Sequence, residues 1–194
     1  MQRMNRLESW FCASSLWRYI TQRRLLPWIL AGTDLGENIL ELGAGWGAAT
    51  AELQRRAHCV TSLEFDHKAA AILQSKISVT CSPGLVVQGD ASTLPFADQI
   101  FTGAIAILML HHLRSRELQD QAFAEIYRVL KPGGIFLTLE IQDGWLQRAG
   151  HIYSTFVPVS LITAPERLQN VGFSNVIIDT RGSAFRLRAT RAKT

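Results

Sequence analysis

The feature that most constrains the fold of this chain is a glycine-rich turn between an apolar strand and a helix. Residues 38–42 form a short apolar run, and residues 43–47 then read Gly-Ala-Gly-Trp-Gly. Helical periodicity begins directly afterwards, over residues 48–56. Such a turn lets a ligand approach the backbone closely, and the N-terminus of the following helix offers N–H groups. The sequence therefore predicts an α/β domain with a ligand site at this turn.

Segments of strand and helix character alternate along the rest of the chain. The expected strands are residues 59–63, 85–88, 101–108 and 135–140, and the expected helices are residues 66–76 and 117–130. This alternation indicates βαβ units and a parallel sheet. Near the end, residues 163–166 form a capping box that predicts a short helix. Residues 173–179 and 184–189 are strand-like and too close for a parallel crossover, so they are predicted to form an antiparallel hairpin.

The beginning of the chain is predicted to be helical. Large apolar residues in the segment 5–30 recur with i, i+3, i+4 spacing, and Pro27 interrupts the pattern. A chain of 194 residues suits one domain with a small addition. We therefore expect a helical cap over residues 1–35 and one compact domain over residues 36–194.

The composition narrows the class of protein. An apolar fraction of 47 % with 19 % charged residues is typical of a globular chain. The longest apolar run, residues 104–110, is far shorter than the ~20 residues that span a bilayer, so no membrane span is expected. Cys12, Cys59 and Cys81 cannot all pair and lack metal-ligand spacing. We therefore expect reduced thiols, no metal and a cytoplasmic location.

The net charge of +4 is unevenly distributed. Residues 1–30 hold five arginines and one acid, whereas residues 31–180 hold ten basic and fifteen acidic residues. Residues 181–194 add four arginines and one lysine without an acid. Basic ends can contact nucleic acid or anionic lipid. However, no Lys/Arg run exceeds two residues, which favours solvated faces.

The glycine pattern alone does not select one cofactor. Gly43-x-Gly45-x-x-Ala48 satisfies the dinucleotide pattern, and Glu64 lies 21 residues after Gly43, at the position of a ribose-binding acid. Glu41 separates the candidates, because it ends the strand two residues before the first glycine. A carboxylate there repels a pyrophosphate and suits a cofactor that carries an ammonium and a sulfonium group.

The stretch from Ile39 to Gly47 resembles the first motif of class I S-adenosylmethionine-dependent methyltransferases. Four further stretches resemble later motifs in the family order: residues 63–66, 88–96, 108–113 and 127–134. The resemblance covers about residues 36–190 and is strongest to small-molecule methyltransferases similar to the quinone-biosynthesis group. It implies a Rossmann-like three-layer α/β sandwich, with a seven-stranded, mostly parallel sheet and an antiparallel last strand. It also implies methyl transfer from S-adenosylmethionine to a small-molecule acceptor.

The resemblance implies a set of cofactor-binding residues. They are Glu41, Gly43, Ala44, Gly45, Glu64, Phe65, Asp90, Ala91 and Leu108. In the family, the acid at the position of Glu64 binds the ribose hydroxyls, and the segment of Asp90 and Ala91 contacts adenine. The Asp/Asn-Pro-Pro-aromatic motif used to methylate base amines is absent from residues 108–113, which counts against a nucleic-acid acceptor of that type.

Residues after the fourth and fifth expected strands are candidates for contacts with the acceptor. His111 and His112 are the candidate catalytic residues, because one of them could be a general base for a weakly acidic acceptor. Glu140 and Asp143 could bind an acceptor cation, and His151 and Tyr153 lie in the 141–162 connection, a candidate lid. Trp46, inside the glycine turn, must face either the ligand or the N-terminal helix.

Three other functions remain compatible with the sequence. A nicotinamide-dependent oxidoreductase is disfavoured by Glu41 and by the lack of a substrate domain. A nucleic-acid methyltransferase could use the basic termini. A binding subunit could hold S-adenosylmethionine without turnover.

Overall fold

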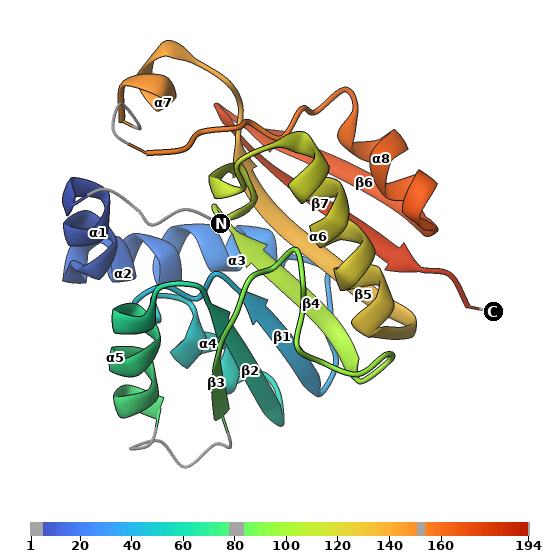
Figure 1. Cartoon of the computed structure of the whole chain (residues 1–194), viewed down its shortest axis with the longest axis horizontal. Helices are drawn as coiled ribbons and strands as arrows, with labels where there is room; N and C mark the ends of the chain where they lie inside the picture. Colours follow the sequence, from blue (N-terminus) through green and yellow to red (C-terminus); the bar gives the residue numbers. More distant parts are fainter. Residues whose placement is uncertain (1–5, 78–83, 151–153, 194) are drawn as a thin grey trace.

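The computed structural model describes residues 6–77, 84–150 and 154–193, and it contains a seven-stranded sheet with helices on both faces (Figure 1). The strands are β1 (Asn38–Leu42), β2 (Cys59–Glu64), β3 (Gly84–Gln88), β4 (Phe101–Ile107), β5 (Leu130–Ile141), β6 (Phe173–Arg181) and β7 (Ala184–Arg191). Their order in the sheet is β3-β2-β1-β4-β5-β7-β6. Strand β7 is antiparallel to β5 and β6, and the other pairs are parallel. The predicted Rossmann-like fold and its terminal hairpin are confirmed.

The order of the strands fixes where a ligand can bind. β1 pairs with β2 on one side and with β4 on the other, so the direction of the crossover connections reverses at β1. In open α/β sheets, the crevice at such a switch point, beyond the carboxyl ends of the strands, is the usual ligand site. The glycine-rich turn follows β1 directly and is therefore at this crevice.

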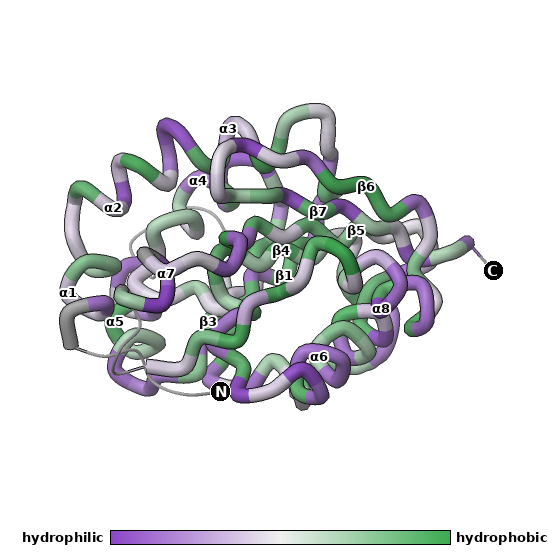
Figure 2. The backbone as a smooth tube through the Cα atoms, turned by 90° about the horizontal axis from the view of Figure 1, so that it is seen from above, coloured by the Kyte–Doolittle hydropathy of each residue, from purple (hydrophilic) through white to green (hydrophobic). Residues whose placement is uncertain are grey.

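Alternate residues of the central strands supply two different cores. Leu40 and Leu42 belong to the core shared with α6 (Arg116–Val129) and α8 (Ala164–Val171), whereas Ile39 belongs to the core shared with α3 (Leu26–Ile29) and α4 (Thr50–Gln54). The period of two follows from the pleat of a strand. Figure 2 shows the result, with hydrophobic residues along the middle layer and mixed colours on the outer helices. Glu41 therefore shares the face of the sheet that α4 covers.

The N-terminal segment is not the single helix that was predicted for residues 5–30. It contains α1 (Arg6–Ala13), α2 (Ser15–Ile20), the π-helix η1 (Thr21–Leu25) and α3. Ser14 is extended, and its hydroxyl accepts a hydrogen bond from the N–H of Trp17 at 3.1 Å, which begins a new helix. Helical spacing cannot show this break, because the apolar period continues across the cap.

Three other boundaries differ from the prediction. The helix after the glycine turn is shorter, with residues 45–49 forming turns before α4. Residues 131–134, which precede the expected strand 135–140, form the irregular beginning of β5. The predicted capping box at residues 163–166 does not form, because Thr163 is already helical and its hydroxyl makes no cap hydrogen bond. Among the described residues, the structure also contains α5 (His67–Ile77), whose first N–H groups donate to Asp66, and α7 (Trp145–Gly150).

Candidate active site

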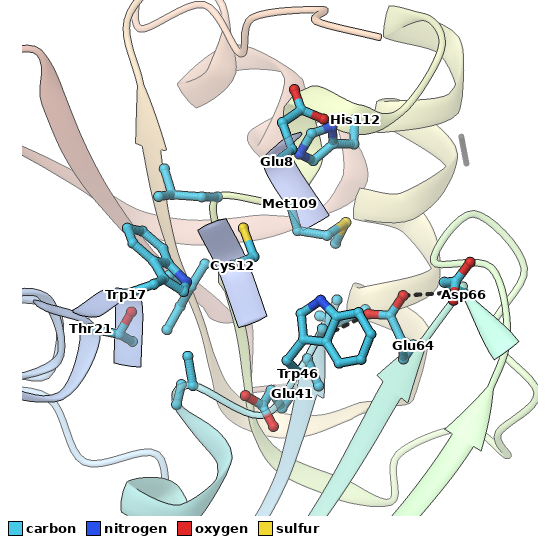
Figure 3. Close-up of a pocket in the computed structure, with 18 of the residues that line it drawn as sticks. Glu8, Cys12, Trp17, Thr21, Glu41, Trp46, Glu64, Asp66, Met109 and His112 are labelled. Atoms are coloured by element: carbon cyan, nitrogen blue, oxygen red, sulfur yellow. Dashed lines mark hydrogen bonds between the residues drawn. The ribbon is translucent and has the colours of Figure 1, made fainter. Parts of the chain in front are cut away.

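A cavity of about 310 Å³ lies at the switch point of the sheet (Figure 3). The ends of β1, β2 and β4 form one side of it, and α1, α2 and η1 cover another side. Its volume is in the range of small-molecule sites. Its apolar lining includes Phe11, Trp17, Leu42, Ile107, Leu108, Met109 and Ile141.

The glycine turn has a backbone that requires glycine. Gly43 and Gly45 have φ of +66° and +55°, in the left-handed region. A Cβ atom on Gly43 would lie 2.2 Å from Cγ of Met109, so another side chain passes directly over it. A Cβ atom on Gly45 would meet nothing within 4 Å, although Gly45 lines the cavity. Gly45 therefore leaves space that a ligand can fill.

The turn is attached to the end of β2. The N–H groups of Gly43 and Ala44 both donate to the carbonyl of Leu63, at 2.9 and 3.1 Å. Glu64 accepts hydrogen bonds from the N–H of Gly45 at 2.7 Å and from the N–H of Asp66 at 2.8 Å (Figure 3). Burial raises the pKa of Glu64, and these backbone hydrogen bonds oppose the shift. A carboxylate is thus held in the wall of the cavity, beside Phe65.

Glu41 is a second buried acid in the same cavity. Its side chain is almost inaccessible, and Oε2 accepts hydrogen bonds from the hydroxyls of Thr50 and Ser62, both at 2.7 Å. Burial raises the pKa of Glu41 to about 7, although the two hydrogen bonds lower it. A ligand cation placed beside this group would favour its charged form. Glu41 thus lines the cavity, and its contact with a ligand stays a prediction.

The two histidines lie in the 3₁₀ turn η2 (Leu110–His112), and both line the cavity. His111 is 2 % exposed, and its Nδ1 lies 2.5 Å from Oε2 of Glu140. Oε1 of Glu140 accepts hydrogen bonds from the N–H groups of Met109 at 3.1 Å and Leu110 at 2.8 Å. The rings of His111 and His112 are 4.3 Å apart.

The expected role of Glu140 as a ligand for an acceptor cation does not agree with this geometry. Glu140 is fully buried, and its oxygens are bonded to the η2 turn. Asp143 is also paired, with Arg148 at 2.6 Å on the surface. Neither Glu140 nor Asp143 therefore faces the cavity as proposed.

His151 and Tyr153 lie outside the described residues.

Asp90 and Ala91 are not among the described residues that line the cavity. Asp90 accepts hydrogen bonds from the N–H and hydroxyl of Ser92, at 2.9 and 2.8 Å, and Ala91 is fully buried. Their contact with adenine stays a prediction. Leu108, by contrast, lines the cavity, and it has an unusual φ of +51°. Such strain in a residue with a side chain is frequent at functional sites.

Sequence reasoning did not find Thr21. The π-helix η1 begins at Thr21, whose buried hydroxyl lines the cavity and has no hydrogen-bond partner among the described residues. Nε1 of Trp46, also at the cavity, is buried without a partner in the same part of the chain. Two unpartnered polar groups in one cavity indicate a ligand with its own polar atoms. Short π-segments are frequent at functional sites, but no sequence pattern used above detects them.

No group of three or more potential metal ligands occurs in the part of the chain that the structure covers. No described helix is long and apolar enough to cross a membrane.

The fold and the site define a Rossmann-like α/β protein with a nucleoside-cofactor crevice of the methyltransferase type. Residues 40–138 match the family model described as "Methyltransferase domain". The chain belongs to this family, whose cofactor is S-adenosylmethionine. The predicted family and the predicted cofactor are therefore confirmed.

Curated relatives and solved structures agree with this assignment. The chain is 31 % identical over 132 residues to the ubiquinone/menaquinone biosynthesis C-methyltransferase UbiE of Vibrio cholerae, covering 65 % of this chain and 49 % of the relative. It is 31 % identical over 151 residues to the demethylmenaquinone methyltransferase of Corynebacterium kroppenstedtii, covering 77 % and 58 %. The chain thus spans about half the length of the curated relatives it matches.

The solved structures support the fold over nearly the whole chain. A SAM-dependent methyltransferase from Methanosarcina mazei has a TM-score of 0.71 and 18 % identity, covering 87 % of this chain and 98 % of that one. A Haloferax volcanii methyltransferase solved with the activator Trm112 has a TM-score of 0.78 and 14 % identity, covering 99 % and 100 %. At this identity the likeness concerns the fold alone.

Proposed function

We propose that this chain transfers a methyl group from S-adenosylmethionine to a small, largely apolar acceptor. The observation that carries the proposal is the cavity at the switch point, which combines a glycine turn, two buried acids and an apolar lining. The names of the quinone-biosynthesis relatives support an apolar acceptor. None of the comparisons favours an oxidoreductase, a nucleic-acid methyltransferase or a binding subunit without turnover.

The residues around the cavity fit the cofactor. Gly45 leaves room beside the turn, and the buried groups of Thr21 and Trp46 lack partners that a polar ligand would supply. We propose that Glu64 accepts hydrogen bonds from the ribose hydroxyls and that Glu41 faces the cationic part of the cofactor. Gly43, Ala44, Phe65 and Leu108 would complete the contact surface, and Asp90 and Ala91 would contact adenine.

The bound cofactor supplies an activated methyl group, so the protein has to hold the acceptor in line and exclude water. The N-terminal helices are placed to do this, because Phe11, Cys12 and Trp17 line the cavity together with the ends of the strands. We propose that residues 1–35 act as a cap on the domain formed by residues 36–194. Arg186 of β7 supports this attachment, because it donates to the carbonyls of Trp28 at 2.7 Å and Ala31 at 2.9 Å.

The free thiols of Cys12 and Cys59 support the expected cytoplasmic location.

Binding of the cofactor is expected to stabilise the fold. S-adenosylmethionine at about 100 times its Kd should add roughly 2.7 kcal/mol to the free energy of unfolding. For a chain of this size, that raises the Tm by roughly 5–11 °C. Thermal unfolding with and without the cofactor measures the shift, with NADH as the control ligand. A rise with NADH and none with S-adenosylmethionine would reverse the cofactor assignment.

Glu64→Gln is expected to weaken binding of S-adenosylmethionine by roughly 1.5–3 kcal/mol, because charge-assisted hydrogen bonds are lost. The amide oxygen can still accept from a backbone N–H, so the variant should fold. Titration calorimetry on the folded variant measures the change in Kd. Glu52→Gln is the matched control, because Glu52 of α4 pairs with Arg55 and Arg56, just beyond the helix, and does not line the cavity. An unchanged Kd in Glu64→Gln would refute the ribose contact.

A further inference from the structure

A second cavity, of about 230 Å³, lies next to the glycine turn. Its walls come from α2 and η1, from the turn itself, and from α4 and α5. Figure 1 shows α2 and α5 at the same end of the molecule. Among the described lining residues, Trp46 is the only one that both cavities share. The second cavity is therefore distinct from the cofactor crevice but in contact with the turn that forms it.

The charges around the second cavity are all positive. Arg18 of α2 and Lys76 of α5 are the only ionisable side chains among the described residues that line it. Within the described part of the chain, neither side chain forms an ion pair. Nζ of Lys76 donates to the carbonyl of Trp46 at 2.9 Å, which uses one of its three N–H groups. Partial burial and then the charge of Arg18 lower the pKa of Lys76. Two cations therefore face one cavity without a counter-charge.

A buried donor in the same wall favours a ligand of the same kind. Gln54 of α4 lines the second cavity and is 7 % exposed, and its Nε2 has no hydrogen-bond partner among the described residues. A buried N–H₂ group without an acceptor is costly, so its place in a cavity wall indicates a ligand that accepts hydrogen bonds. The acids Glu41 and Glu64 line the first cavity and not this one. Charge and hydrogen bonding thus both favour an anion.

The groups at the second cavity also select the class of anion. Arginine and lysine bind phosphate oxygens through charge-assisted hydrogen bonds, the arginine fork with two oxygens and the lysine as a point charge. An amide N–H₂ adds a donor for a further oxygen. Ala51 and Leu73 give the cavity an apolar part as well, which suits the organic group of a phosphate ester.

We propose that the second cavity binds a phosphate oxyanion, free or as a monoester, between Arg18 and Lys76. The anion joins the N-terminal helices to α5, and Trp17 of α2 and Trp46 of the turn both line the first cavity. Holding these two walls together favours the arrangement that binds S-adenosylmethionine, so the anion strengthens cofactor binding. No methyl acceptor is involved.

Titration calorimetry with inorganic phosphate tests the site. The ionic strength has to be constant, because salt screens exposed charges. We expect saturable binding of one phosphate per chain. Lys76→Met and Arg18→Gln should each raise the Kd for phosphate roughly tenfold or more, because each removes a charge-assisted hydrogen bond. Lys76→Arg should bind phosphate more tightly than Lys76→Met, because it keeps the charge.

The chain offers a matched control for each of the two variants. Lys68→Met makes the same change on the same helix as Lys76→Met, and Arg23→Gln makes the same change in the segment that follows α2. Neither Lys68 nor Arg23 lines the second cavity, so both controls should keep the Kd for phosphate. Thermal unfolding checks that every variant is folded. Absence of saturable binding to the unmodified protein, or an equal loss in Lys68→Met and Lys76→Met, would overturn the site.

Phenyl phosphate distinguishes the two sources of the oxyanion. Tighter binding of phenyl phosphate than of inorganic phosphate assigns a phosphate monoester, because the apolar part of the cavity then contributes. Equal or weaker binding of phenyl phosphate assigns free phosphate.

The Kd for S-adenosylmethionine, measured with saturating phosphate and with chloride at equal ionic strength, tests the link to the cofactor. Phosphate should lower this Kd about fivefold or more, and the effect should disappear in Lys76→Met. The cofactor should lower the Kd for phosphate by the same factor. An unchanged Kd for S-adenosylmethionine would overturn the link. Loss of S-adenosylmethionine binding under both conditions would contradict the proposed function, whereas the phosphate titration decides the site by itself.

Discussion

Gly43→Ala is expected to destabilise the fold strongly, whereas Gly45→Ala should fold and bind the cofactor more weakly. Both positions have positive φ, which costs an alanine roughly 1–2 kcal/mol. Only at Gly43 would the new Cβ also collide with Met109, at 2.2 Å from Cγ and 2.8 Å from Cβ, and overpacking of this kind costs roughly 1–3 kcal/mol more. Gly43→Ala should therefore lower the Tm by roughly 4–20 °C, and Gly45→Ala by roughly 2–8 °C.

The two variants are controls for each other. At Gly45 the added methyl group enters the cavity, so the Kd for S-adenosylmethionine should rise roughly tenfold or more. Thermal unfolding measures the fall in Tm of both variants, and titration calorimetry measures the rise in Kd of Gly45→Ala. Adding Met109→Ala to Gly43→Ala should recover part of the lost stability, because it removes the closest atom. Tight cofactor binding by Gly45→Ala would show that the cofactor does not lie against the turn.

Glu41→Gln is expected to stabilise the protein without cofactor at pH 8. The pKa of Glu41 is raised from 4.5 to about 7 in the folded state, so between these values the folded chain holds a proton that the unfolded chain has lost. Stability therefore falls as the pH rises through this window and stays lower above it. A glutamine cannot ionise and avoids this loss, which amounts to about 3 kcal/mol at most. Its oxygen can still accept from Thr50 and Ser62.

Denaturant unfolding at pH 4.5 and pH 8 tests this expectation. The two proteins should have similar stability at pH 4.5, and the variant should be more stable at pH 8. The same variant should bind S-adenosylmethionine more weakly at pH 8, because the cationic part of the ligand loses a negative partner. If the unmodified protein and Glu41→Gln were equally stable at pH 8 as well as at pH 4.5, the pKa of Glu41 would not be raised in the folded protein.

The fold could be predicted because its signals are local. The apolar run of β1, the glycines after it and the short separation of β6 and β7 each select one arrangement. The break at Ser14 and the π-turn at Thr21 could not be predicted, because neither changes the spacing of apolar residues. Both features depend on how the N-terminal segment packs over the sheet.

The site could be predicted in part for a similar reason. Glu41, Gly43, Gly45 and Glu64 lie at strand ends, and the topology brings these ends together. The use of Glu140 could not be predicted, because a carboxylate at the end of a strand can face either a ligand or a neighbouring turn. Which one it faces depends on the path of the η2 turn, whose N–H groups it binds.

The attachment of Arg186 to the carbonyls of Trp28, Ile29 and Ala31 has a consequence for biosynthesis. The ribosome makes the cap first and β7 more than 150 residues later, and β7 also fills the place between β5 and β6. Before β7 is in place, the N-terminal segment lacks the bonds of Arg186 and is held by the core that α3 shares with β1, β4 and β5. Contacts this distant in sequence form late and slowly. We expect a chain shortened before β7 to hold the N-terminal helices less firmly and to bind the cofactor more weakly.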